Sequence, residues 1–309
     1  MTGQWNVVGL GGRAKAFVHN HRDRLLRQAV WEIWERAYRL APVRASLRPF
    51  VPLRKPEAWL FPVGCYNSGT TLLLHILGAH PDVRTLPDEG VRFTSVLHRP
   101  EELGWTRMWA RCPEHVCMPG RVDPPVARRV MQDWSALWGR GGRVFMDKSI
   151  SNTTRMTWLD LNFPHSHFIG MVRNGYCVAS GIRSKARPKG TAAREIGDRY
   201  PIALAGEQWV VSNRVMMRDA ALVARFRLLR YEDLVSKPLE VVTDLWNFVG
   251  LPVPRQRAIA GGIEIEGRAF AVEDMNAAAM RSLAREDVET LAPILSKTMA
   301  AFGYSPDRP

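Results

Sequence analysis

The chain has 309 residues, of which 46% are hydrophobic and 24% are charged. These proportions are ordinary for a packed globular protein and exclude a wholly disordered chain, and no apolar run approaches the roughly 20 residues that span a bilayer. The net charge of +13 favours anionic partners, but only seven of the 43 basic residues are lysine. Because the sequence has no aromatic RNA-binding platform and no zinc-finger spacing, we expect no nucleic-acid partner.

The N-terminal part of the chain, residues 1–57, is predicted to be a helical extension of the main domain. Residues 1–12 lack the basic start and long apolar core of a signal peptide, which favours a cytoplasmic protein. Residues 21–40 carry apolar side chains at helical spacing, with most of their arginines off the apolar stripe. The simpler interpretation is a surface helix, and the alternative is a basic helix in peripheral contact with a membrane. A proline-marked linker is expected over residues 42–56.

From residue 58 onward, apolar runs alternate with helical patterns. The predicted strands are residues 58–64, 83–85, 143–147, 167–172 and 226–231. The predicted helices are residues 70–81, 156–163, 236–250 and 281–302. This alternation implies an α/β domain over residues 58–309, with a central parallel sheet flanked by helices.

A glycine-rich loop, GCYNSGTT at residues 64–71, lies between the first predicted strand and the first predicted helix. Its glycines have the spacing of the triphosphate loop G-x-x-x-x-G-K-[ST]. Such a turn points backbone N–H groups at an anion, and the helix N-terminus adds a partial positive charge. Thr70 stands where the lysine of triphosphatases reaches the β- and γ-phosphates, so the loop suits a 5′-phosphate that carries no γ-phosphate.

The loop and its companions resemble the sulfotransferases that use 3′-phosphoadenosine 5′-phosphosulfate (PAPS), in the style of the tyrosylprotein and bacterial enzymes. The family loop reads [KR]-S-G-T-T, and here it is NSGTT at residues 67–71. An arginine after a strand, followed by a serine, is matched by Arg173 and Ser180. Three further motifs match in the family's order: DKS at residues 147–149, RYEDL at residues 230–234 and GY at residues 303–304.

The resemblance spans roughly residues 58–305 and implies a three-layer P-loop-type fold with PAPS as the co-substrate. The residues that it places around the 5′-phosphosulfate are Tyr66, Asn67, Ser68, Gly69, Thr70 and Thr71. Arg173 and Ser180 would bind the 3′-phosphate, and Arg173 also follows a predicted central strand, at the edge where open α/β sheets bind ligands. Two positions depart from the family: Asn67 replaces a cation, and Ser180 comes one residue early, where the family serine would coincide with Gly181.

Sulfuryl transfer needs a cation for the leaving oxygen and a base for the acceptor. Lys148, directly after a predicted strand, is the expected cation. The resemblance assigns the base to Glu89, with Asp88 as the near alternative. His75, between apolar neighbours on the loop helix, is predicted to be a core residue rather than a base.

No metal is expected to take part in this chemistry. The pair Cys112 and Cys117 flanks His115, but no second pair lies at zinc-ligand spacing. His165 and His167 also have a spacing that admits a metal, although two histidines at a strand start are weak support for one. The sequence does not determine the oligomeric state.

Two other functions compete with a sulfotransferase. Asp147 ends a predicted strand as a magnesium-binding aspartate would, which admits a P-loop kinase or NTPase. A non-catalytic nucleotide-binding protein is the other alternative. For a sulfotransferase, we expect a small-molecule acceptor that offers a hydroxyl or an amine. Residues 92–142, which contain four tryptophans, are expected to line its pocket, unless those rings form the core.

Overall fold

The computed structural model describes residues 32–139 and 141–305, which fall into two compact units that meet in sequence after Phe50. In the first unit, residues 32–38 are helical, followed by α2 (Ala41–Leu47) and the 3₁₀ turn η1 (Arg48–Phe50). The linker predicted over residues 42–56 is therefore wrong in its first part. Pro42 lies in the first turn of α2, where its missing N–H costs no hydrogen bond. The prediction of a helix over residues 21–31, with its membrane contact, lies outside the described residues.

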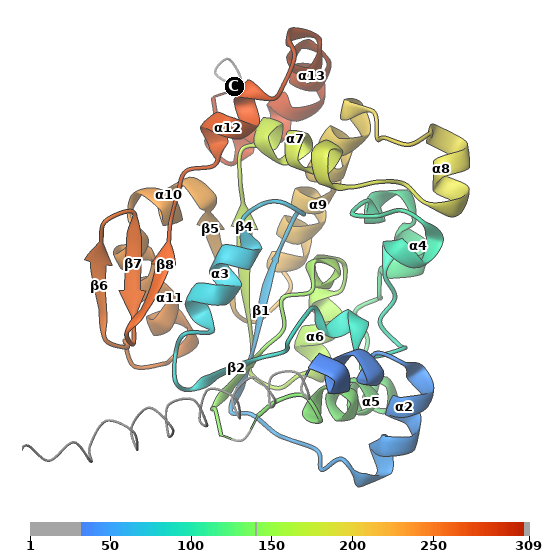
Figure 1. The fold of residues 1–309 in the computed structure, drawn as a ribbon, viewed down its shortest axis with the longest axis vertical. Coiled ribbons are helices and arrows are strands. Elements are labelled where there is room, and N and C mark those ends of the chain that lie inside the picture. The colour runs from blue at the N-terminus through green and yellow to red at the C-terminus, as the bar shows by residue number, and fades with distance from the viewer. Residues whose placement is uncertain (1–31, 140, 306–309) are drawn as a thin grey trace, which may run out of the picture. The chain divides into compact units, whose positions relative to one another are not determined.

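The second unit contains a five-stranded parallel sheet with the strand order β2-β3-β1-β4-β5 (Figure 1). Its strands are β1 (Ala58–Gly64), β2 (Val83–Thr85), β3 (Val144–Met146), β4 (Ser166–Val172) and β5 (Phe226–Arg230). All five coincide with predicted strands within one or two residues. Every residue of β1 and β4 is buried, as expected of central parallel strands.

Helices cover both faces of this sheet. Alternate side chains of β1 point to opposite faces, and on each face they pack against helices. Leu60 belongs to the apolar cluster formed with α3 and α11. Trp59 points the other way, with its ring centroid 4.8 Å from that of Phe163 and 6.2 Å from that of Trp134. These helices are α3 (Thr70–Leu77), α5 (Pro124–Ser135), α6 (Met156–Asn162) and α11 (Pro238–Val249). The three-layer α/β fold is confirmed.

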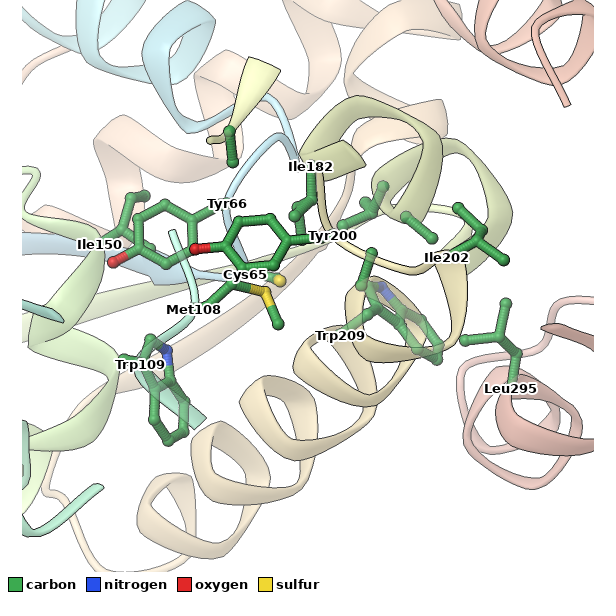
Figure 2. Packing of buried hydrophobic residues seen from close by; sticks show 14 of the residues in the cluster. Cys65, Tyr66, Met108, Trp109, Ile150, Ile182, Tyr200, Ile202, Trp209 and Leu295 are labelled. Carbon is green, nitrogen blue, oxygen red and sulfur yellow. The ribbon is translucent and has the colours of Figure 1, made fainter. Parts of the chain in front are cut away.

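A second group of helices packs around the carboxyl ends of the strands, and its longest member also runs along one face of the sheet, where Sδ of Met216 would lie 2.9 Å from a Cβ atom on Gly170 of β4. It consists of α7 (Gly175–Lys185), α8 (Gly190–Ile196), α9 (Ile202–Ala220), α10 (Tyr231–Ser236), α12 (Asn276–Arg281) and α13 (Arg285–Ala301). Figure 2 shows Trp209 of α9 and Leu295 of α13 in the same apolar cluster. The longest of these helices, α9, was not predicted, because the buried polar residues Gln208, Ser212 and Asn213 interrupt its apolar stripe.

The segment left unassigned by the sequence, residues 99–142, contains short elements. They are η3 (Pro100–Leu103), η4 (Trp109–Arg111), α4 (Pro113–Val116) and α5. Two further 3₁₀ turns, η2 (Gly90–Arg92) and η5 (Ile150–Thr154), follow β2 and β3.

A small antiparallel sheet, also unpredicted, follows α11. Its strands are β6 (Gln256–Ile259), β7 (Gly262–Ile265) and β8 (Arg268–Ala271). Glu266 and Gly267, with φ values of 48° and 76°, form the tight turn between β7 and β8, as in two-residue hairpins. Ile263 and Ile265 are buried against the α11 side of the core. Among the described helices, none has the length and apolar character needed to cross a bilayer.

Candidate active site

A tight loop, residues 65–69, connects the carboxyl end of β1 to α3. Gly64 and Gly69 have φ values of 146° and 97°, which residues with side chains rarely adopt. A Cβ atom on Gly64 would lie 2.4 Å from the carbonyl oxygen of Met171 in the neighbouring strand β4. The hydroxyl of Thr153 accepts from the Gly64 amide at 2.8 Å and donates to the Gly64 carbonyl at 2.9 Å. The end of β1, where the loop begins, is therefore fixed by its close approach to β4 and by the hydroxyl of Thr153.

Two buried polar atoms of this loop lack a protein partner. The hydroxyl of Ser68 and the side-chain amide nitrogen of Asn67 form no hydrogen bond with any of the described residues. The N-terminus of α3, which begins at Thr70, lies beside them and contributes its partial positive charge. Since buried polar atoms are nearly always hydrogen-bonded, the loop fits an anionic group, as its sequence predicts.

Arg173 follows directly on β4 and reaches back to the same loop. Its Nη1 donates to the Asn67 carbonyl oxygen at 3.1 Å, and its Nε donates to Oδ1 of Asn276 at 2.7 Å. Its guanidinium carbon lies 4.3 Å from the centroid of the Tyr231 ring. Three different elements thus hold this buried cation beside the loop.

The motif residues Arg230, Glu232 and Tyr304 contact one another and the backbone next to Arg173. The Tyr304 hydroxyl donates to Oε2 of Glu232 at 2.7 Å, and Oε1 of Glu232 accepts from the Asn174 amide at 3.1 Å. The guanidinium carbon of Arg230 lies 4.3 Å from the centroid of the Tyr304 ring. The RYEDL and GY motifs, some 70 residues apart, therefore meet in space and support the end of β4.

Ser180 lies in α7, and the structure does not bring it to the cavity that Arg173 lines. Its hydroxyl is 2.6 Å from that of Ser282, which also donates to the Ala279 carbonyl oxygen at 2.6 Å. A phosphate at Arg173 would require the Ser180 hydroxyl to exchange this partner. Its assignment as a phosphate ligand stays a prediction.

Glu89 and Lys148 meet beyond the ends of β2 and β3. Lys148 Nζ lies 3.2 Å from Oε1 of Glu89, and the side chains are 12% and 21% exposed. Burial raises the pKa of Glu89, and the nearby charges of Lys148 and Arg92 oppose that rise. A carboxylate whose pKa is raised by burial is a better proton acceptor than an exposed carboxylate.

Asp88, the alternative base, has other partners. Its Oδ1 accepts from the Glu89 amide at 2.7 Å, and its Oδ2 lies 3.1 Å from Nε of Arg92. The geometry favours Glu89, since only this carboxylate contacts Lys148.

Asp147 is fully buried and holds the Glu89 turn in place. Its Oδ1 accepts from the Gly90 amide at 2.8 Å and from the Ser149 hydroxyl at 2.9 Å, while its Oδ2 accepts from Nδ2 of Asn152 at 2.7 Å. Burial raises the pKa of Asp147, and these hydrogen bonds oppose the rise. Both oxygens are thus used within the protein, which argues against a magnesium-binding role.

The loop, Arg173, Glu89 and Lys148 line one cavity of about 290 Å³. The predicted site residues in its lining are Tyr66, Asn67, Gly69, Thr70, Thr71, Glu89, Lys148 and Arg173. Ser68 and Ser180 are not part of the lining. The residues that sequence reasoning missed are Arg92, Glu101, Arg107, Ile150 and Lys185.

Arg107 is the most informative of the missed residues. Its Nη1 donates to Oδ1 of Asn67 at 2.8 Å, and its backbone amide donates to Oε1 of Glu101 at 3.2 Å. It has a φ of 59°, a left-handed conformation that is uncommon outside glycine. No sequence signal marks this arginine, because it lies in an irregular segment about 40 residues from the loop that it contacts.

The four tryptophans of residues 92–142 form core rather than pocket. Trp134 and Trp138 are buried against Trp59 of β1. Trp105 and Trp109 belong to the cluster beneath the loop, where Figure 2 shows Trp109 with Met108 near Tyr66. The expectation that these rings line an acceptor pocket is wrong for this cavity, to which the segment contributes charged side chains instead.

A second cavity of about 280 Å³ shares Thr71, Glu89 and Lys148 with the first. His75 lines it and is exposed, so the prediction of a core histidine is wrong. The buried positions of α3 are Leu73, Ile76 and Leu77, and residue 75 faces away from them at the helical repeat.

Residues 60–255 match the sulfotransferase family. The chain belongs to this family. The match covers more than half of the chain and includes the loop, Glu89, Lys148 and Arg173.

Two curated proteins and a solved domain show how far this sulfotransferase resembles known proteins. Nodulation protein NoeE of Sinorhizobium fredii is 27% identical over 234 residues, which are 68% of this chain and 51% of that protein. Protein-tyrosine sulfotransferase 1 of Danio rerio is 25% identical over 86% of this chain and 79% of its own length. The chain thus spans about half the length of NoeE. The sulfotransferase domain from the curacin biosynthetic pathway is 18% identical, with a TM-score of 0.48, over 82% of this chain and 99% of that domain.

Proposed function

We propose that this chain transfers a sulfuryl group from PAPS to a hydroxyl or amine of a small-molecule acceptor. The observation that carries the proposal is the common cavity of the phosphate loop, Arg173, Lys148 and Glu89. One donor molecule has a 5′-phosphosulfate and a 3′-phosphate, and the loop and Arg173 are two separate anion-binding elements beside each other. The buried unpaired donors on Ser68 and Asn67 fit the 5′ end of that molecule.

The catalytic roles follow from which groups carry charge. As the S–O bond to the nucleotide breaks, negative charge develops on the nucleotide's phosphate oxygen, and Lys148 is placed to stabilise it. As the acceptor oxygen or nitrogen bonds to sulfur, Glu89 takes its proton. Asn67 carries no charge, and Arg107, which donates to its side-chain oxygen, brings a cation to this part of the cavity. No metal ion is required for these steps.

A kinase or NTPase is less well supported. Thr70 occupies the position of the loop lysine, and the carboxylate oxygens of Asp147 accept hydrogen bonds from Gly90, Ser149 and Asn152. A magnesium ion at Asp147 would have to displace these partners. Family membership together with this geometry favours sulfuryl transfer.

The second cavity offers a route for the acceptor. It shares the lining residues Thr71, Glu89 and Lys148 with the first cavity, so an acceptor bound there would lie beside the proposed base. Apolar side chains of Leu74, Leu86 and Met146 also line it. We therefore place the acceptor on the side of α3, with the nucleotide on the side of Arg173.

The donor assignment predicts that 3′-phosphoadenosine 5′-phosphate stabilises the protein more than AMP does. At 100 times its Kd, a ligand that binds only the native state adds about 2.7 kcal/mol to the free energy of unfolding. For a protein of this size, that corresponds to a Tm increase of about 5 °C. Thermal melts with each nucleotide at equal concentration make the comparison. Equal shifts would remove the 3′-phosphate site, and a larger shift with ATP and Mg²⁺ would favour a kinase.

Arg173→Ala is expected to weaken binding of the bisphosphate by about 30-fold, because a lost hydrogen bond to a charged group costs about 2 kcal/mol. AMP affinity should change much less. Isothermal titration calorimetry measures both. Arg183→Ala is the matched control, since Arg183 lies in α7 and pairs with Asp287 at 2.5 and 2.7 Å, outside the cavity. If AMP binding falls as much as bisphosphate binding, Arg173 acts by holding the Asn67 carbonyl and not by binding the 3′-phosphate.

A further inference from the structure

A cluster of two imidazoles and a carboxylate lies apart from the proposed catalytic groups. Nδ1 of His98 is 3.1 Å and Nε2 of His115 is 2.9 Å from the same oxygen, Oε2 of Glu102. The three ligand atoms all lie within 4.8 Å of one another. Among the described residues, this is the only group of three such side chains that could hold a metal ion. It differs from the pair Cys112 and Cys117, which the sequence admitted but did not favour as a zinc site.

The separations of these atoms match those around a bound ion. Nitrogen and oxygen ligands lie about 2.1 Å from Zn²⁺, so two ligands of one ion are about 3.0 to 3.4 Å apart at octahedral or tetrahedral angles. The two contacts with Glu102 fall close to this range. The ring nitrogens of His98 and His115 lie within 4.8 Å of each other and would have to approach to bind one ion, which the 52% exposed His98 side chain has room to do.

A buried arginine fixes the backbone of the segments that carry these three side chains. Arg155 is fully buried, and its Nη2 donates to the His98 carbonyl oxygen at 2.9 Å and to the Val116 carbonyl oxygen at 3.1 Å. One guanidinium group thus joins the segment before η3 to the end of α4. His98, Glu102 and His115 converge because of this bridge, although 12 residues separate Glu102 from His115.

We propose that His98, Glu102 and His115 form a binding site for a divalent transition metal ion, with Zn²⁺ as the best match. Two imidazoles and one carboxylate suit zinc and the neighbouring late transition metals, and solvent completes the coordination because the cluster is partly exposed. Arg99 lies 3.5 Å from Oε1 of Glu102, so it occupies the oxygen that the metal does not use.

The metal ion would link the two ends of an irregular segment, residues 98–115. That segment carries Arg107, which contacts Asn67 in the catalytic cavity. The ion has no part in the sulfuryl transfer itself. Its expected effect is to slow amide hydrogen exchange in residues 103–112, because both ends of the segment are then fixed.

The test uses the full chain freed of metal by a chelator and titrated with Co²⁺, whose visible d–d bands report its coordination. We expect one ion per chain, and competition by Zn²⁺. His115→Gln and Glu102→Gln should each weaken binding at least about 100-fold, since even outer partners of metal ligands contribute about 10- to 100-fold. His165→Gln is the control, because His165 is exposed and outside the cluster.

Three results would overturn the proposal: no saturable binding, binding that survives both His115→Gln and Glu102→Gln, or a thiolate charge-transfer band that assigns the ion to cysteine. If one of these variants fails to fold, His98→Asn gives the same test, since its exposed ring is the easiest to replace. The measurement involves no nucleotide and no turnover, so its outcome is independent of the proposed sulfotransferase activity.

Discussion

Lys148→Ala is expected to lower kcat about 10²- to 10³-fold while leaving nucleotide affinity within tenfold of the wild type. Removing one group that stabilises charge in the transition state has this size of effect, because the charge on the leaving oxygen is absent from bound PAPS and develops only as the S–O bond breaks. Steady-state kinetics with PAPS and an alcohol-like acceptor, combined with nucleotide binding measured by calorimetry, separates the two quantities.

Two controls sharpen this test. Lys185→Ala removes another lysine of the same cavity, one that is exposed and does not pair with Glu89. It should reduce kcat far less, and an equal loss would mean that only the total charge of the cavity matters.

The second control concerns pH. Because Lys148 opposes the rise in the pKa of Glu89, its removal should shift the acid limb of the pH–rate profile to higher pH. Kinetics at alkaline pH exclude this indirect effect, and full rescue there would contradict a direct role for Lys148.

Glu89→Gln is expected to lower kcat about 10²-fold or more for a hydroxyl acceptor, with nucleotide binding retained. Glutamine keeps the size and hydrogen bonding of the side chain but cannot take the acceptor's proton. The wild-type rate should fall as the pH drops through the pKa of Glu89, because the base is active only when deprotonated. Since burial raises this pKa, the fall should begin at a higher pH than for an exposed glutamate.

Asp88→Asn and His75→Gln are the matched controls for the base. Asp88 contacts Arg92 rather than Lys148, so its variant should stay active. His75 lines the second cavity together with Glu89 and is another nearby group that can take a proton. If Glu89→Gln stays active and His75→Gln is inactive, the base belongs to α3.

The sequence alone determined the central sheet and the place on it of the predicted anion-binding loop. Strands such as residues 58–64 and 167–172 are short, largely apolar runs, and buried parallel strands favour that composition on both faces. The GCYNSGTT loop and Arg173 each follow such a strand directly. Since the carboxyl ends of parallel strands lie at one edge of a sheet, their proximity followed from their places in the chain. The same reasoning brought Lys148 to that edge, whereas Glu89 was predicted only from the resemblance to the sulfotransferases.

Only the tertiary structure decided which other side chains share the cavity. Arg107 reaches Asn67 from an irregular segment with a left-handed backbone, a contact that no local pattern encodes. The choice of Glu89 over Asp88 depended on Lys148, which lies some 60 residues further along the chain. The prediction for His75 failed for a different reason: it was made from the apolar neighbours along the chain, whereas the helical repeat of α3 turns that position outward. The contacts of Arg107 with Asn67 and of Lys148 with Glu89 join residues distant in sequence, and such contacts are decided by packing rather than by local propensity.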